Sequence, residues 1–187
     1  GSQDQIAAAY GGINLITFLK NSDFLTTKLT IPKKNLLKLE KNLMLFFTGR
    51  KRNSSRMAGK IIENISKKEK HLIEMQKMPL IAKNLLLSNN FNDNEFGQLL
   101  DFAWHSKKEL SSFVSNSFIN EIYQTAINKG AIGGKLLGAG FGGFILFYVP
   151  QHKQKSVLLG LKNLTHVPFK FEFEGSKIVL CQPKGFS

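Results

Sequence analysis

The sequence contains very little cysteine and few acidic residues. Among its 187 residues there is one cysteine, Cys181, and 13 Asp and Glu side chains stand against 26 Lys and Arg, for a formal net charge of +13. A single cysteine cannot form an intramolecular disulfide, and the histidines show no metal-ligand spacing with it, so no structural zinc site is expected. The charge favours an anionic partner: nucleic acid, an acidic membrane surface or small phosphorylated molecules.

Long apolar stretches and a secretory leader are also missing. The longest apolar run, residues 136–149, is too short for a membrane helix and is rich in glycine. Residues 1–12 contain no basic region followed by an apolar one, as a signal peptide would. We therefore expect a cytoplasmic protein with no membrane partner. A hydrophobic content of 42% with 16 phenylalanines predicts a buried core, in one domain or two small lobes.

Local patterns predict strands in the first quarter of the chain and helices after it. Residues 13–19 and 24–31 resemble a hairpin that follows an alanine-rich helix, and residues 42–48 read as a strand buried on both faces. Helical periodicity begins after Gly49, with buried positions at 58–65 and a kink or break expected at Pro79.

Three further helices and a closing hairpin complete the prediction. The helices are expected from Asn92, which pairs with Glu95 in a capping-box pattern, from residue 117 to 130, and across residues 157–164. Residues 169–174 alternate Phe with charged side chains and are followed by Gly175 and Ser176, which predicts a final hairpin with a two-residue turn. Runs of helices and sequential hairpins indicate an α+β fold with an antiparallel sheet and packed helices.

A glycine-rich segment, GGKLLGAGFGGFILFYV, covers residues 133–149 and contains the pattern G-x-G-x-x-G at Gly138, Gly140 and Gly143. A dinucleotide fingerprint would continue into a helix and reach an acid about 20 residues later. Here a strand, FILFYV, follows, and no Asp or Glu occurs between Phe144 and Phe171. The dinucleotide interpretation therefore fails.

A Walker P-loop also fails in this segment. Lys129 stands where its first glycine is required, and Leu136 replaces the Ser or Thr that would hold magnesium. Two interpretations stay open: glycines that present backbone amides to phosphate groups, or a tight turn that serves strand packing.

The densest basic cluster is GRKRNSSRMAGK, residues 49–60. Its cations lie between a strand end and a helix start, where free amides and guanidinium groups form an anion site. A solvated basic turn is the alternative. No aromatic residue interrupts the cluster, as a single-strand stacking surface would require. Lys135 can approach the same phosphates or extend into solvent from a strand end. The substrate-phosphate candidates are Arg50, Lys51, Arg52, Arg56 and Lys135.

Three blocks, QDQIAAAYGG, LFFTGRKRNSS and GGKLLGAGFGGFILF, together resemble the GHMP small-molecule kinases, in that family's order and over nearly the whole chain. The resemblance implies that residues 1–40 end an N-terminal catalytic lobe of the ribosomal S5-like type and that residues 41–187 form a ferredoxin-like C-terminal lobe. ATP, with Mg²⁺, and a sugar phosphate would bind between the lobes. The implied reaction phosphorylates the anomeric hydroxyl of a heptose 7-phosphate in nucleotide-activated heptose biosynthesis.

The resemblance also assigns roles to residues. Asp4 would be the catalytic base, although an isolated aspartate at a helix start can simply interact with the helix dipole. No metal ligand is assigned to this chain. The family's proline- and glycine-rich nucleotide loop does not occur here, so we expect a fragment that is inactive alone and needs an N-terminal lobe as partner. The glycine loop near the nucleotide would comprise Gly138, Ala139, Gly140, Phe141, Gly142 and Gly143.

Two alternatives remain at this point. A strongly basic α+β chain can be a nucleic-acid-binding module, which salt-dependent binding would reveal. Within the resembled family, the substrate can be another sugar or an isoprenoid phosphate, since the basic cluster indicates only that the substrate already carries phosphate.

Overall fold

In the computed structural model the chain forms two compact units, and residues 2–50, 68–138 and 142–179 are described. Unit 1 combines residues 1–30 with residues 170–187, and unit 2 contains residues 31–169. Compact units do not by themselves locate a lobe boundary in a longer protein. The predicted division between residues 40 and 41 therefore stays a prediction.

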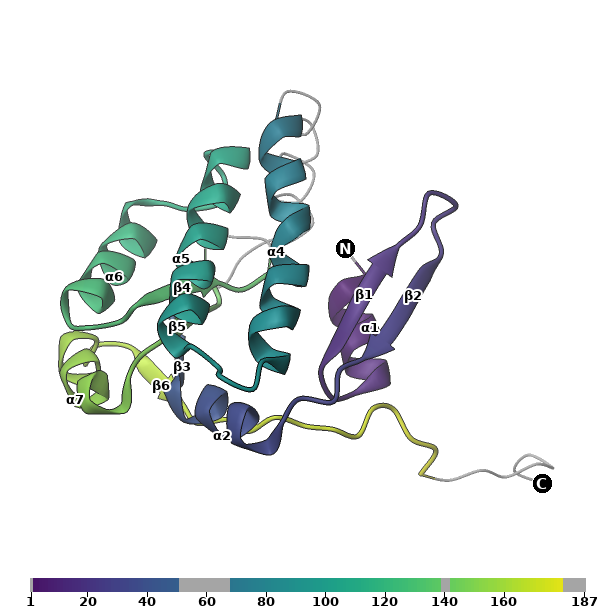
Figure 1. The fold of residues 1–187 in the computed structure, drawn as a ribbon. Coiled ribbons are helices and arrows are strands. Elements are labelled where there is room, and N and C mark those ends of the chain that lie inside the picture. Colours follow the sequence, from purple (N-terminus) through teal and green to yellow (C-terminus); the bar gives the residue numbers. More distant parts are fainter. Residues whose placement is uncertain (1, 51–67, 139–141, 180–187) are drawn as a thin grey trace, which may run out of the picture. The chain divides into compact units, whose positions relative to one another are not determined.

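Unit 1 contains a helix followed by a hairpin, as predicted. Helix α1 (Gln3–Tyr10) ends at Gly11, which adopts a φ of 62° that a residue with a side chain would rarely tolerate. Strands β1 (Asn14–Phe18) and β2 (Phe24–Lys28) pair antiparallel (Figure 1).

The predicted C-terminal hairpin is wrong. Residues 168–179 form no strand. The Glu172 carboxylate accepts hydrogen bonds from the amides of Phe173 and Glu174, at 2.7 and 2.8 Å, and such local bonds compete with a strand ladder. Ser176 donates its amide to the Ala9 carbonyl at 2.9 Å. Gly175 lies so close to that carbonyl that a side chain would clash with it, so this glycine serves close packing on α1 and does not form a hairpin turn.

Unit 2 is built on a four-stranded antiparallel sheet (Figure 1). The strands are β3 (Leu43–Phe47), β4 (Gly133–Leu136), β5 (Phe144–Tyr148) and β6 (Thr165–Val167), in the spatial order β4-β5-β3-β6. Helices connect β3 to β4 and β5 to β6, which is the split β-α-β arrangement of ferredoxin-like folds. The predicted fold class is confirmed.

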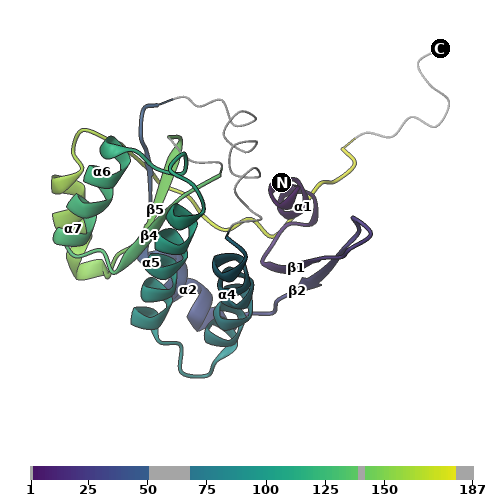
Figure 2. The same ribbon diagram turned by 90° about the horizontal axis from the view of Figure 1, so that it is seen from above.

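Helices flank this sheet in both views of the chain (Figures 1 and 2). They are α2 (Lys33–Asn42), α4 (Glu69–Leu87), α5 (Asp93–Leu110), α6 (Ser117–Asn128) and α7 (Gln151–Gly160). The sequence analysis did not predict α2. A break at Pro79 does not occur, because α4 continues through this residue, and the alternative expectation of a kink stays a prediction. Pro79 is exposed, so the carbonyl that it leaves unpaired can be hydrated. The helical positions predicted at 58–65 lie outside the described residues.

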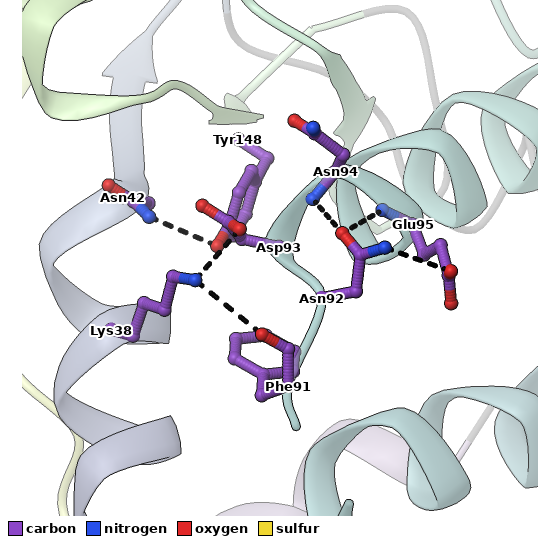
Figure 3. A network of polar contacts seen from close by, with 8 residues as sticks. All are labelled: Lys38, Asn42, Phe91, Asn92, Asp93, Asn94, Glu95 and Tyr148. Carbon is purple, nitrogen blue, oxygen red and sulfur yellow. Dashed lines mark hydrogen bonds and ion pairs between the residues drawn. The ribbon is translucent and has the colours of Figure 1, made fainter.

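Asparagine side chains cap the N-termini of two helices, α5 and α6. The Asn92 carboxamide oxygen accepts from the amides of Asn94 and Glu95, and its nitrogen donates to the Glu95 carboxylate at 2.9 Å (Figure 3). This reciprocal pair confirms the predicted cap of α5. Asn116 accepts from the Ile119 amide at 3.0 Å and caps α6 in the same way.

The core lies between one face of the sheet and helices α5, α6 and α7. Met44, Phe46, Ile145 and Phe147 alternate inward from β3 and β5, and Trp104 of α5 packs with them, fully buried. The residues of β3 that point the other way are only partly buried. The expectation that this strand is buried on both faces was therefore too strong.

A polar network, buried in part, joins α2, β5 and the start of α5 (Figure 3). Asn42 donates to the Tyr148 hydroxyl at 3.1 Å, and Lys38 forms an ion pair of 2.8 Å with Asp93. Tyr148 is fully buried, and its burial raises the pKa of its hydroxyl from 10.0 to about 12. The neutral phenol is thus part of the folded state.

This raised pKa predicts a loss of stability at alkaline pH. Between pH 10 and about 12 the unfolded chain releases the Tyr148 proton while the folded chain keeps it, so the free energy of unfolding falls as the pH rises. Tyr148→Phe should show a shallower fall over that range in urea unfolding. Tyr10→Phe, at an exposed ring, should follow the unaltered chain. Parallel curves for all three proteins would contradict the assignment.

Candidate functional site

The glycine loop, residues 137–143, connects β4 to β5. The last ladder pair is Leu136 with Ile145, and the Leu137 amide donates to the Phe144 carbonyl at 2.8 Å. Residues 133–136 were expected to belong to a glycine turn, whereas they form strand β4. Gly134 allows this strand to pair closely, since a side chain there would collide with Phe147. Ala139, Gly140 and Phe141 lie outside the described residues.

The second end of the loop is fixed to the end of β3. The Gly143 carbonyl accepts from the Thr48 amide at 2.9 Å and from the Thr48 hydroxyl at 2.8 Å. The Gly143 amide donates to the Arg50 carbonyl at 3.1 Å. Gly142 is buried and lies close to the backbone of Arg50. A Cβ on Gly142 would be only 2.8 Å from the Arg50 carbonyl oxygen, so a side chain would clash there. Gly143 has a φ of 94°, which favours glycine.

The first end of the loop is held by a different element. The Lys107 ammonium, in the last turn of α5, donates to the Gly138 carbonyl at 2.5 Å. Gly138 adopts a φ of 70°. The two described ends of the loop therefore have separate anchors, a lysine on a helix and a threonine at a strand end. Sequence reasoning gave a role to neither Lys107 nor Thr48.

Arg50 places a cation next to the loop. Its guanidinium carbon lies 4.2 Å from the ring centroid of Phe118, in the first turn of α6. A guanidinium stacked on an aromatic face has a restricted orientation but keeps its edge for hydrogen bonds to an anion. The structure thus brings Arg50 and the glycine loop together, as an anion site requires. Lys51, Arg52 and Arg56 lie outside the described residues.

Lys135 lies inside β4, not in a turn. It pairs with Leu146 of β5 on the sheet face opposite the core, since its neighbour Leu136 points into the core. Burial lowers the pKa of the Lys135 ammonium. No described residue forms an ion pair or hydrogen bond with that ammonium. A desolvated cation in this state gains from an anionic ligand.

Asp4 belongs to unit 1, whereas Arg50, Lys135 and the glycine loop belong to unit 2. Asp4 lies in the first turn of α1 with its side chain exposed. That position suits both the helix-dipole interpretation and a role as base. Its convergence with the loop stays a prediction.

Trp104 and His105 lie next to each other in α5, and their contacts are those of packing residues. Trp104 is fully buried in the core. The His105 ring nitrogen Nδ1 lies 3.4 Å from the Asp101 carboxylate, which also accepts from the Tyr123 hydroxyl. These contacts fix α5 against α6 and β4.

Neither a cluster of metal-ligating side chains nor a membrane-spanning helix occurs among the described residues. That part of the chain contains no group of three or more His, Cys, Asp or Glu side chains able to hold a metal ion. No helix within the same residues has the length and apolarity needed to cross a bilayer.

Comparison with known proteins places this architecture. Residues 81–164 match the family model of the GHMP kinase C-terminal region. Over these residues the chain is similar to the C-terminal domain of GHMP kinases. It is also 34% identical, over 95% of its length, to the D-glycero-alpha-D-manno-heptose 7-phosphate kinase of Campylobacter jejuni, of which it covers 53%.

Solved structures of GHMP-type kinases share the fold. A D-glycero-D-manno-heptose 1-phosphate kinase from Bacteriodes thetaiotaomicron superimposes with a TM-score of 0.64 at 28% identity, over 96% of this chain and 50% of that one. The mevalonate kinase of L. major, in complex with R-mevalonate, gives 0.67 at 18% identity, over 87% of this chain and 50% of that one, and shows the fold alone. The chain thus spans about half the length of these relatives.

The Thr48 anchor generates a stability prediction. Thr48 is buried, so Thr48→Val keeps the side-chain shape but removes the hydroxyl bond to Gly143. We expect the free energy of unfolding of unit 2 to fall by about 1 kcal/mol, measured by urea titration. Thr165→Val makes the same chemical change at an exposed strand position of unit 2 and should change it much less. An equal effect of the two substitutions would show that the hydroxyl bond contributes nothing.

Proposed function

We propose that the protein containing this chain is an ATP-dependent kinase that phosphorylates the anomeric hydroxyl of a heptose 7-phosphate. The observation that carries the proposal is the 34% identity, along 95% of the chain, to a heptose 7-phosphate kinase. The activity is proposed for a protein of the relatives' length, whose N-terminal half would complete the site. The 187 residues alone are expected to show no turnover.

The glycine loop is assigned to the transferred phosphate. Phosphoryl transfer depends mainly on positioning and on neutralising charge, so backbone amides held in fixed directions are suitable groups. The anchors at Gly138 and Gly143 support this assignment, because they restrain both described ends of the loop. Mg²⁺, when bound with the nucleotide, would supply positive charge that neutralises the phosphates, and we assign it no ligand from this chain.

The basic cluster is assigned to the far phosphate of the sugar. Arg50, stacked on Phe118 beside Gly142, is the described member, and Lys51, Arg52 and Arg56 extend the assignment along the sequence. Lys135 is the remaining candidate cation. A guanidinium can bind phosphate through two parallel hydrogen bonds, which would favour a substrate that already carries phosphate. Another sugar phosphate or an isoprenoid phosphate would satisfy the same cations.

Asp4 is assigned as the base that accepts the proton of the reacting hydroxyl. In the full-length protein, Asp4→Asn should lower kcat by about a hundred- to ten-thousandfold, because the amide cannot accept that proton. ATP affinity, measured by calorimetry, should be retained. Asp23→Asn removes an exposed carboxylate from the hairpin turn of the same unit and should leave kcat unchanged. An Asp4→Asn enzyme with normal turnover would remove Asp4 from the mechanism.

The assignment of Arg50 predicts a substrate-specific defect. In the full-length protein, Arg50→Met should raise the KM for heptose 7-phosphate about ten- to hundredfold, because a charged hydrogen bond is lost. Arg50→Lys should be intermediate, since it keeps the charge but not the fork. Lys155→Met, at an exposed position of α7, serves as the control. If the KM values for heptose 7-phosphate and for heptose rise equally, Arg50 does not bind the 7-phosphate.

The nucleic-acid alternative has no support from the comparisons. Binding of the full-length protein to RNA or DNA with strong salt dependence, together with no binding of ATP or sugar phosphate, would reverse this conclusion.

A further inference from the structure

Lys107 makes a contact that the proposed reaction does not yet use. Its ammonium reaches from the last turn of α5 to the Gly138 carbonyl, 31 residues away in the sequence, at 2.5 Å. A hydrogen bond from a charged donor is about twice as strong as a neutral one. It acts on a glycine with a φ of 70°, where the chain leaves the β4–β5 ladder. The bond therefore fixes the backbone where the ladder no longer does.

The helix that carries Lys107 is itself held firmly. Gly133 of β4 lies so close to the Gly97 carbonyl of α5 that a side chain there would clash with it. Asp101 accepts from the Tyr123 hydroxyl, which links α5 to α6, and Trp104 is fully buried in the core. Figure 2 shows α5 alongside β4. A group that positions a loop needs this kind of rigid support.

We propose that Lys107 is a positioning residue of the glycine loop: it sets the direction of the Gly138 peptide so that the loop is preorganised for phosphate. The role rests on the proposed kinase function. Thr48 and Arg50 restrain the loop at Gly143, and Lys107 restrains it at Gly138. If either restraint is removed, the peptide group at that end, Gly138 or Gly143, is no longer held in one direction. Lys107 thus acts through Gly138 and is not assigned a contact with substrate.

The neighbouring lysine provides a matched control. Lys108 lies in the same turn of α5, but its ammonium is 5.7 Å from the Trp104 ring centroid and 5.9 Å from that of Tyr123. Removing either ammonium changes the net charge and the helix end equally. Among the described contacts of these two lysines, the bond to the loop is made by the Lys107 ammonium. A difference between the two substitutions therefore reports the loop contact and not charge or helix stability.

The experiment compares Lys107→Met, Lys107→Arg and Lys108→Met in the full-length protein. The first readout is amide hydrogen exchange in a peptide spanning residues 137–144. We expect Lys107→Met to accelerate this exchange about three- to tenfold, with exchange in β3 and β5 unchanged, because an exposed charged bond is lost. Lys107→Arg should restore most of the protection, and Lys108→Met should leave the loop unaffected.

The second readout separates binding from chemistry. Lys107→Met should raise the KM for ATP by a similar factor while Asp4-dependent chemistry continues, and Lys107→Arg should rescue it. Unchanged loop exchange in Lys107→Met, or equal changes in Lys107→Met and Lys108→Met, would overturn the proposal. Faster loop exchange in Lys107→Met, with no ATP binding by the unaltered protein, would support the anchor and remove the kinase function instead.

Discussion

The antiparallel pairing of β3 with β5 determines the site. Its register places Phe47 opposite Phe144, so the next residues along each strand, Thr48 and Gly143, meet although they lie 95 positions apart in the sequence. Phe46 and Phe147 are buried on one face of this pair. A shift of one residue would turn them toward the opposite face, which fixes the register strongly. Hydrophobic burial thus sets the distance between the cation at Arg50 and the glycine loop.

Glycine has a different task at each place where it is needed in unit 2. Gly133 lets α5 approach the edge strand β4, and that approach determines where the end of α5 lies. Gly142 lets the loop lie against the backbone of Arg50. Gly138 and Gly143 supply positive φ angles at the two ends of the loop. The packing interpretation and the phosphate interpretation are therefore compatible, since glycines that allow close packing also position the amides.

The sequence predicted those elements whose signals are local. FILFYV became β5, and the Asn92 and Glu95 pair capped α5, because composition and capping act over a few residues. The alternation of residues 169–174 was misleading, because the Glu172 carboxylate accepts hydrogen bonds from nearby amides and such local bonds compete with a strand ladder. Strand β4 was missed because half of it is glycine. A short strand that consists largely of glycine shows almost no alternation of apolar and polar side chains.

The site was predictable only where its residues stand out in composition. Arg50 belongs to a dense basic cluster, and the loop glycines form a visible motif, so both could be named as candidates from the sequence. Lys107 does not stand out among the many lysines of the sequence, and its contact with Gly138 exists only because α5 packs on β4. The partner of such a side chain is set by tertiary structure, which no spacing rule encodes.

The shared fold explains where the sheet, helices and loop lie, but it does not explain which substrate a protein selects. The mevalonate kinase and the heptose kinase structures both superimpose on this chain, although their names give them different substrates. A backbone framework that is shared by kinases of different substrates cannot by itself distinguish those substrates. That distinction must come from side chains at the edge of the framework. Arg50 is stacked on Phe118, and its carbonyl accepts a hydrogen bond from the Gly143 amide. The same stretch of backbone therefore holds one end of the loop and positions the guanidinium.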